Sequence, residues 1–303
     1  MINAVKFKSG QHRIDQDFIE KCDREFDALL ENAVGSICRD SKDIRVMGLT
    51  GPTCSGKTTA AKKLLRSFRE NGKRVVTVSL DDFFKDSFSR DSLKDVNIEE
   101  LDFDSPDTLD TELLSRFVDE IFATGRAEKP IFDFVSGERS RYEEIICSEG
   151  DVMLFEGIQV LYPAVLSVIE EHGGRILGVR PESGIEIGGK RFEPNFIRLC
   201  RRLVRDSNFR GASPDFTLSL WNSVRRNEEE NIFPHIHRVN VAIDTTLAYE
   251  LNVLAPYLRK ILPEIEEGSK HHKESLEILG LLEEIEGIES FAVGEDSLYK
   301  EFV

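Results

Sequence analysis

The sequence predicts an α/β protein in three layers, with helices on both faces of a mainly parallel five-stranded sheet. Short apolar runs rich in β-branched residues alternate along the chain with longer segments of helical periodicity. The first apolar run leads directly into a glycine-rich loop that opens a helix, Gly51-Pro52-Thr53-Cys54-Ser55-Gly56-Lys57-Thr58. Together these two observations predict the P-loop NTPase fold.

The individual elements follow from local patterns. Apolar residues at helical spacing between positions 15 and 38 predict an amphipathic helix packed on the core. We expect strands at 44–50, 74–80, 151–155, 175–179 and 239–243, and helices at 57–70, 107–124 and about 195–207. Glycines between positions 183 and 191 predict a hairpin or loop.

The same pattern suggests three segments. Residues 1–43 are expected to form an N-terminal helical extension, and residues 44–255 the P-loop domain, with a basic helical lid at about 195–235. Residues 256–303 are expected to form a C-terminal helical tail. Within and just before this tail, the stretch 249–286 is predicted helical and acidic, and the stretch 291–303 extended.

Composition narrows the class of protein. The 303 residues are 40% hydrophobic, and no apolar run approaches the ~18–20 residues that span a membrane, so we expect no membrane association. Five cysteines without CxxC spacing predict neither a disulfide framework nor a zinc site, and point to the cytoplasm. The net charge of -16 argues against a nucleic-acid partner. Any bound anion should therefore be held by a local basic site.

The loop at 51–58 matches the pattern GxxxxGK(S/T), which predicts an ATP and Mg²⁺ site. Its backbone amides and the N-terminus of the following helix suit phosphate oxygens, and Thr59 extends this set of ATP contacts. We expect Lys57 to reach the β- and γ-phosphates and the Thr58 hydroxyl to bind magnesium. The alternative is a glycine turn beside an exposed lysine.

Carboxylates follow two of the predicted strands, at the edge of a parallel sheet where ligands bind. Asp81 could there accept the proton of an attacking hydroxyl, and Glu156 could bind magnesium or its waters. The alternatives are that Asp81 and Asp82 only cap the next turn, and that Glu156 is structural. The chain contains neither an NKxD guanine-binding string nor an LSGGQ signature, which disfavours a GTPase switch and an ABC ATPase.

Four arginines share one face of the predicted helix at 195–207: Arg198, Arg201, Arg202 and Arg205. Like charges at this spacing repel one another unless an anion or carboxylates offset them. A lid over the phosphates of ATP would supply such an anion. The alternative is a solvated helix face paired with nearby acidic residues.

From residue 44 to about residue 254, the chain resembles the uridine kinase and phosphoribulokinase family of P-loop kinases. Besides the phosphate loop, the matching segments are SLDDFFKD (79–86), DFDSPD (102–107), PIFDF (130–134), FEGI (155–158) and RLCRRLVRD (198–206). The segments FRGAS (209–213), WNSVRR (221–226), IFP (232–234) and YEL (249–251) are similar to a bacterial branch usually called nucleoside kinases.

The resemblance implies roles for individual residues. It implies that Asp81 is the catalytic base and that Asp104 and Arg198 hold the ribose hydroxyls. It also implies that Arg202 and Arg205 are lid arginines near the phosphates, with Arg202 and Lys57 assisting catalysis and Arg205 contacting ATP.

The segment 129–140 is expected to form a wall of the acceptor site, although an ordinary core strand is the alternative. The residues expected to contact substrate there are Phe84, Phe132, Phe134 and Arg139. Pyrimidine nucleoside kinases carry a tyrosine at the position of Phe132 and a histidine at that of Gly137, and both contact the base. The phosphoryl-transfer residues therefore match the family, whereas the pyrimidine-binding residues do not.

These observations predict transfer of the γ-phosphoryl group of ATP to a hydroxyl of a small molecule, with a nucleoside 5′-hydroxyl as first choice. The alternatives are another sugar, polyol or small-metabolite alcohol, and a regulatory nucleotide-binding protein without turnover. The preference for ATP over GTP and a possible homo-oligomer stay open.

Overall fold

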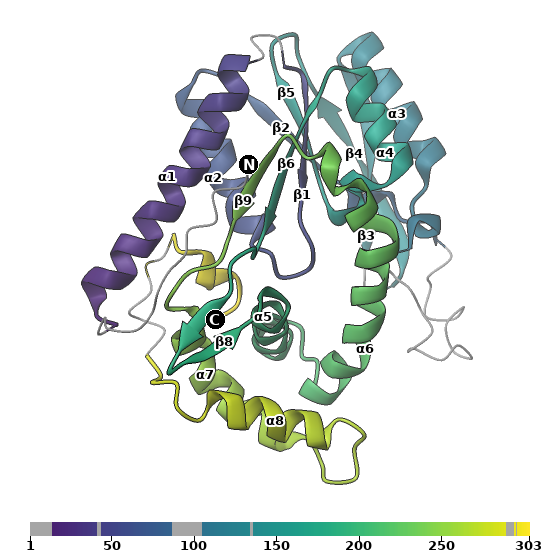
Figure 1. The fold of residues 1–303 in the computed structure, drawn as a ribbon. Coiled ribbons are helices and arrows are strands. Elements are labelled where there is room, and N and C mark those ends of the chain that lie inside the picture. The colour runs from purple at the N-terminus through teal and green to yellow at the C-terminus, as the bar shows by residue number, and fades with distance from the viewer. Residues whose placement is uncertain (1–13, 41–43, 87–104, 134–135, 289–293, 295) are drawn as a thin grey trace.

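The central sheet of the protein is five-stranded and parallel, as the sequence predicts (Figure 1). The computed structural model describes residues 14–40, 44–86, 105–133, 136–288, 294 and 296–303. In spatial order the strands are β2 (Val75–Ser79), β5 (Val152–Glu156), β1 (Val46–Thr50), β6 (Arg175–Arg180) and β9 (Val241–Asp244). The carboxyl ends of all five therefore lie along one edge.

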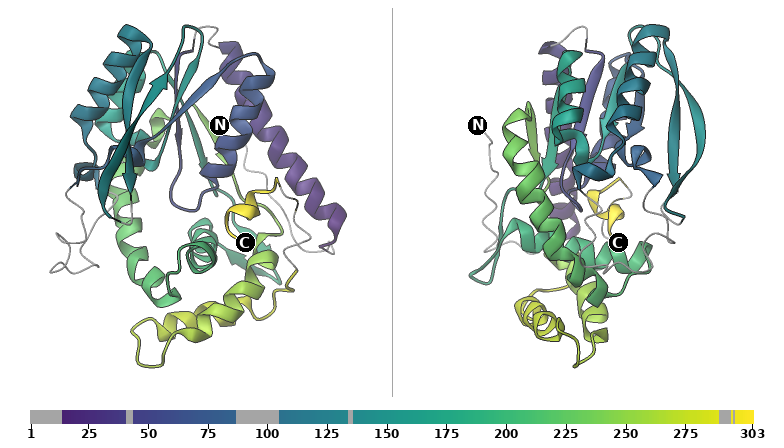
Figure 2. Two further views of the ribbon diagram at one scale, coloured as in Figure 1. Left: turned by 180° about the vertical axis from the view of Figure 1, so that it is seen from behind. Right: turned by 90° about the vertical axis from the view of Figure 1, so that its right-hand side faces the viewer.

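Helices cover both faces of the sheet and complete the predicted three layers (Figures 1 and 2). One face carries α1 (Gln16–Asp40) and α2 (Lys57–Glu70), and the other carries α3 (Thr111–Thr124) and α4 (Pro163–Glu171). Successive side chains of a strand point to opposite faces. Leu154 of β5 accordingly joins the buried cluster with α1 and α2, whereas its neighbours Met153 and Phe155 join the cluster with α3 and α4.

Of four further described helices, three lie beyond the carboxyl edge of the sheet, and the fourth, α6 (Pro214–Asn227), runs from there up beside it (Figure 1). The three are α5 (Pro194–Phe209), α7 (Glu250–Ile261) and α8 (His272–Leu282). Shorter helical turns are η1 (Leu80–Phe83), η4 (Pro106–Thr108), η5 (Ile158–Leu161), the π-turn η6 (Glu228–Ile232), η7 (Phe233–Arg238), η8 (Leu262–Glu264) and η10 (Leu298–Glu301). Side chains of α1, α2, α5, α7, α8 and η10 share one buried cluster. The predicted segment boundaries at residues 43 and 255 stay a prediction.

Two antiparallel hairpins lie outside the central sheet. The predicted hairpin at 183–191 forms from β7 (Ile185–Ile187) and β8 (Lys190–Phe192). The predicted acceptor wall at 129–140 belongs to a longer hairpin of β3 (Arg126–Asp133) and β4 (Glu138–Ile146). Most β4 side chains are exposed, and β3 buries alternate residues against the protein.

Three sequence expectations need correction. The helix expected from residue 107 begins at Thr111, because the Asp110 side chain caps it by accepting a hydrogen bond from the Leu113 amide. The helical stretch expected at 249–286 is interrupted after α7, where a 3₁₀ turn precedes α8. The stretch expected to be extended from residue 291 contains the 3₁₀ helix η10, since Leu298, Tyr299 and Phe302 bury their side chains.

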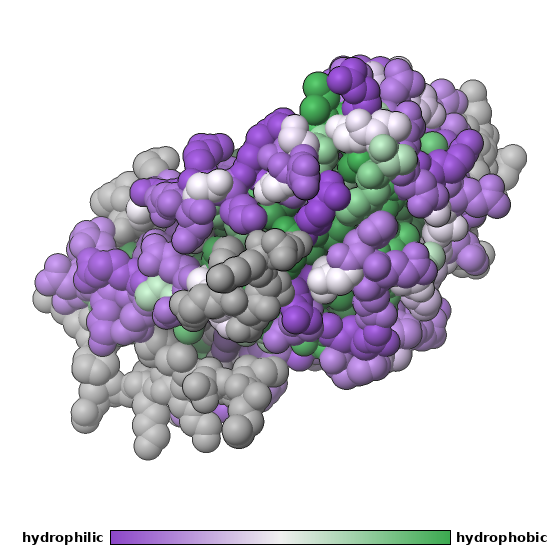
Figure 3. Space-filling view, turned by 90° about the horizontal axis from the view of Figure 1, so that it is seen from above, coloured by the Kyte–Doolittle hydropathy of each residue, from purple (hydrophilic) through white to green (hydrophobic). Residues whose placement is uncertain are grey.

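Most of the described surface seen in Figure 3 is hydrophilic. Apolar residues show mostly in a band across the middle of this view, with hydrophilic residues on either side. Within the described part of the chain, no helix is both long and apolar enough to cross a membrane.

Candidate active site at the phosphate loop

The glycine-rich loop joins β1 to α2 at the carboxyl edge of the sheet (Figure 1). Cys54 and Gly56 both have positive φ, 57° and 91°, and this turns the backbone tightly ahead of α2. A β-carbon at Gly51 would come within 2.2 Å of the Val179 carbonyl oxygen, so only glycine fits there. Gly56 is the N-cap of α2 and has no side chain that could accept a hydrogen bond from the amides of the first turn.

The Ser55 side chain is a second feature of the loop that suits a phosphate ligand. The Ser55 hydroxyl is buried and has no hydrogen-bond partner among the described residues. A buried hydroxyl without a partner is costly, and a phosphate oxygen would satisfy it. The N-terminus of α2 beside it also favours an anion, because its amides and the helix dipole carry partial positive charge.

The oxygen ligands expected for magnesium flank this loop. Thr58 lies in the first turn of α2, and Glu156 ends β5 between Leu49 of β1 and Ser79 of β2. Within the described residues no group of three or more His, Cys, Asp or Glu side chains could hold a metal. Magnesium commonly binds one or two protein oxygens together with phosphates and waters, so Thr58 and Glu156 suit it.

Glu156 lies in an acidic and partly buried environment. Burial raises the pKa of its carboxyl above the ordinary value, and the charges of Asp81 and Glu301 raise this pKa further. The ammonium of Lys57 acts in the opposite direction. Glu156 thus experiences the negative charges of Asp81 and Glu301, and a cation beside the phosphate loop would offset this repulsion.

The two aspartates after β2 have different partners. The side-chain amide of Gln159, buried in η5, donates a 2.7 Å hydrogen bond to Asp81. Asp82 instead forms an ion pair with the buried Lys129 and accepts a hydrogen bond from the Phe132 amide at 3.2 Å. Asp82 therefore ties η1 to β3, whereas Asp81 is oriented by a neutral amide near Glu156.

The expected acceptor wall is built around two rings. Phe84 and Phe132 are nearly buried and meet edge to face, with their centroids 5.6 Å apart. The Arg139 guanidinium donates to the Phe84 carbonyl at 3.0 Å and to the Asp110 carboxylate at 2.8 Å. These contacts bring three of the expected substrate residues together with the turn after β2. Two others, Asp104 and Phe134, lie outside the described residues.

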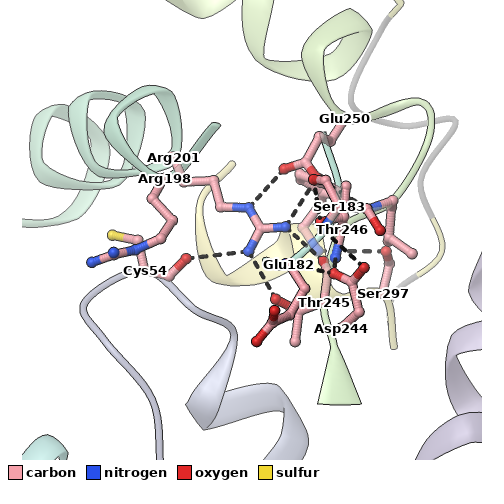
Figure 4. Close-up of polar contacts among 12 residues, drawn as sticks. Cys54, Glu182, Ser183, Arg198, Arg201, Asp244, Thr245, Thr246, Glu250 and Ser297 are labelled. Atoms are coloured by element: carbon pink, nitrogen blue, oxygen red, sulfur yellow. Dashed lines mark hydrogen bonds and ion pairs between the residues drawn. The ribbon is translucent and has the colours of Figure 1, made fainter. Parts of the chain in front are cut away.

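Two arginines of α5 bind the backbone of the phosphate loop, and Figure 4 shows the contact between Arg201 and Cys54. Arg198 donates to the Thr53 carbonyl at 3.1 Å, and Arg201 donates to the Cys54 carbonyl at 3.2 Å. Both guanidinium groups are buried, and each is paired with a buried carboxylate. The partners are Glu228 for Arg198 and Glu250 for Arg201. The ion pairs fix the two arginines in place, and the arginines hold the loop against α5.

The other two arginines of this face share one carboxylate. Arg202 lies 3.3 Å and Arg205 lies 2.7 Å from Asp206, measured between the charged atoms. Carboxylates therefore offset all four arginines. Arg205 is partly buried and the other three are buried, so the face is not the solvated one that the sequence alternative supposed. Whether Arg202 and Arg205 also contact phosphates stays a prediction.

A parallel sheet with this loop at its carboxyl edge and acidic residues beside it defines a P-loop protein. Residues 46–250 match the family model described as Phosphoribulokinase / Uridine kinase family. The chain belongs to this family, which makes it a P-loop kinase that transfers a phosphate group to an alcohol.

Individual relatives agree with this assignment. A uridine kinase from Clostridium tetani is 30% identical over 189 residues, which cover 61% of this chain and 79% of that protein. The chloroplastic uridine/cytidine kinase UKL1 of Arabidopsis thaliana is 29% identical over 176 residues, covering 58% of this chain and 32% of that protein.

Similar solved structures include two kinases. A possible uridine kinase from Bacillus stearothermophilus has 19% identity and a TM-score of 0.45, over 71% of this chain and 99% of that chain. A D-glycerate 3-kinase from Cryptococcus neoformans has 16% identity and a TM-score of 0.36, over 86% and 87%. Both TM-scores are below 0.5, so the family assignment rests on the sequence match.

Proposed function

We propose that the protein transfers the γ-phosphoryl group of ATP to a hydroxyl of a small molecule, most simply the 5′-hydroxyl of a nucleoside. The observation that carries this proposal is the placement of Asp81, which Gln159 orients beside Glu156 at the phosphate-loop edge. The family match and the relatives named uridine kinase support the nucleoside as acceptor.

Each residue of the site has a role in this reaction. The loop amides, Ser55 and Lys57 would bind the phosphate oxygens, and Thr58 and Glu156 would hold magnesium, which supplies charge neutralisation at the phosphates when bound. Asp81 would accept the proton of the acceptor hydroxyl as that oxygen bonds to the γ-phosphorus. The bond between the γ-phosphorus and the bridging oxygen breaks, and ADP leaves.

The acceptor wall favours a broader choice of substrate than a pyrimidine nucleoside. Phe132 offers no side-chain hydrogen bond, and Gly137 has no side chain. A site without polar partners for the base discriminates poorly between related substrates. Another sugar, polyol or small-metabolite alcohol is therefore the second candidate acceptor.

The experiment is a turnover assay with ATP, and in parallel with GTP, against a panel of nucleosides, sugars and polyols. The proposal expects acceptor-dependent ADP formation that is lost in Lys57→Ala and Thr58→Ala. Loss of a contact made to the transferring phosphate typically costs several kcal/mol of barrier, at ~1.4 kcal/mol per tenfold. Turnover by folded Lys57→Ala at the wild-type rate would refute the proposed use of the loop.

A further inference from the structure

The helical turn η10 lies beside the N-terminus of α2 and the phosphate loop (Figure 2), and its Glu301 carboxylate contacts the first turn of that helix. Glu301 Oε2 accepts a hydrogen bond from the Thr59 backbone amide and another from the Thr59 hydroxyl, each at 3.3 Å. Thr59 is one of the residues expected to bind ATP. An anion from the chain itself thus occupies two donors of the predicted nucleotide site.

Apolar contacts hold this carboxylate in place. Leu298 is fully buried and packs on the loop, where a β-carbon at Gly56 would come within 2.2 Å of its Cδ1. The rings of Tyr299 and Phe302 lie against the Arg201 guanidinium, 5.9 and 5.3 Å from ring centroid to Cζ. The segment therefore packs on both the phosphate loop and α5.

Polar contacts anchor both ends of the same segment, residues 296–303. Ser297 Oγ lies 3.1 Å from the Asp23 carboxylate of α1 and 3.2 Å from the Tyr249 hydroxyl next to α7. The Phe302 carbonyl accepts a 3.1 Å hydrogen bond from Asn208 of α5. The 296–303 segment therefore contacts four helices around the loop, and these contacts fix its backbone position.

We propose that the 296–303 segment is an intramolecular competitor of the nucleotide, in which the Glu301 carboxylate occupies phosphate donors at Thr59 and must leave when ATP binds. A carboxylate and a phosphate accept hydrogen bonds from the same donors, and both are favoured by the helix N-terminus. The two anions would also repel each other if both stayed. This inference rests on the proposed ATP site.

The geometry suits a contact that can open. Both Glu301 hydrogen bonds are longer than the 2.7–2.9 Å typical of charge-assisted bonds, and the side chain is half-buried. Displacement by a more highly charged triphosphate is then feasible. The apparent affinity for ATP is then the intrinsic affinity multiplied by the fraction of molecules in which the Glu301 carboxylate has left the Thr59 donors.

The test measures the dissociation constant of Mg-ATP by calorimetry for the wild-type chain, Glu301→Ala and Glu283→Ala. Glu283 is exposed at the end of α8, so its change removes the same charge away from the loop. We expect a Kd about three- to thirtyfold lower for Glu301→Ala and an unchanged Kd for Glu283→Ala. An unchanged or higher Kd in Glu301→Ala would overturn the inference, and would mean that the carboxylate stays beside the nucleotide.

Hydrogen exchange of the wild-type chain gives an independent readout that needs no variant. Exchange in residues 296–303 should become faster when Mg-ATP saturates the protein. Slower or unchanged exchange at saturation would contradict displacement. The proposed ATP site fails in a different way, through wild-type protein that binds no ATP or through a Lys57→Ala variant that binds it equally well.

Discussion

The side-chain amide of Gln159 donates a 2.7 Å hydrogen bond to the carboxylate of Asp81, and this bond connects η5 to the turn after β2. Its other side-chain atom, Oε1, is buried without a partner among the described residues. A β-carbon at Gly157 would come within 2.3 Å of this oxygen, so glycine is needed for Gln159 to lie where it does. A buried oxygen without a partner lowers the stability of the fold, so a glutamine at this position makes sense through its contact with Asp81.

We expect Gln159→Met to lower kcat about ten- to a hundredfold with little change in the Kd for ATP. Methionine has a similar shape, so the substitution removes the hydrogen bond without leaving a large cavity. Asp81 would then lose the orientation that a proton acceptor needs. Steady-state kinetics with separate ATP-binding measurements would check this. A variant with normal kcat would show that Gln159 does not position Asp81.

The partners of Asp81 and Asp82 predict opposite effects of the same substitution. Asp81→Asn should lower kcat by about two to four orders of magnitude, the usual contribution of a general base, and leave stability nearly unchanged. Asp82→Asn should mainly destabilise the fold by about 1–3 kcal/mol, because the buried Lys129 loses its main partner and, among the described residues, keeps only Glu143 at 3.3 Å. Urea unfolding and turnover of both variants distinguish the roles. The reverse pattern would assign the base to Asp82.

The Arg201–Glu250 pair predicts a large loss of stability when only one partner is removed. Both side chains are fully buried, and the guanidinium also holds the Cys54 carbonyl. Glu250→Gln leaves a buried positive charge without its counter-charge, which typically costs about 3–5 kcal/mol. Urea unfolding of Glu250→Gln, Arg201→Met and the double variant would check this. If the two single losses simply add in the double variant, the pair is not coupled.

The structure gives Arg139 a role in acid stability. Burial acts to raise the pKa of Asp110, but the Leu113 amide and the Arg139 guanidinium outweigh it, and the net pKa is lower than the ordinary value. A lowered folded-state pKa stabilises the protein above the unfolded value, about 3.9, and this stabilisation is lost as the pH falls through the folded pKa. The stability difference between wild type and Asp110→Asn should therefore be larger at pH 7 than at pH 3. Asparagine keeps the helix cap, so a pH-independent difference would argue against the ionic role.

Local sequence patterns predicted the helices and strands whose formation depends mainly on residues close in the sequence. The helix at 57–70 has the predicted bounds, and the five strands lie within a few residues of their predicted positions. Long-range pairing was not predictable in this way. Glu228 and Glu250 lie 30 and 49 residues from their arginine partners, and no spacing in the sequence relates them.

In the candidate site, too, the features set by local sequence were predictable and the long-range contacts were not. Its loop and carboxylates follow strands and could be located from the sequence, and the structure brings them to one edge. Gln159 and Glu301 were missed, since one lies in an apolar run and the other in a tail predicted to be extended. The sequence signal for Gln159 was its polar side chain within the apolar run after Glu156, where a polar residue needs a partner if it is buried.

The last prediction concerns the acceptor, because the wall around Phe132 differs from that of pyrimidine nucleoside kinases. We expect uridine and cytidine to be unexceptional substrates of the wild-type protein. The double variant Phe132→Tyr with Gly137→His should raise kcat/KM for uridine about ten- to a hundredfold, the worth of one or two recovered hydrogen bonds. Gly137, however, has a φ of 75° and donates a 2.7 Å hydrogen bond to the Asp133 carbonyl at the hairpin turn. A histidine there should cost about 1–2 kcal/mol of stability.

A matched variant distinguishes this strain from the chemistry of the imidazole. Asparagine tolerates the left-handed region better than most residues, so Phe132→Tyr with Gly137→Asn tests the turn without supplying the histidine. We expect this variant to be more stable than the histidine variant in urea, with a smaller gain for uridine. Wild-type protein that prefers uridine or cytidine over every other acceptor would refute the expectation. Main-chain groups near Gly137, or a side chain such as Arg225, would then have to bind the base.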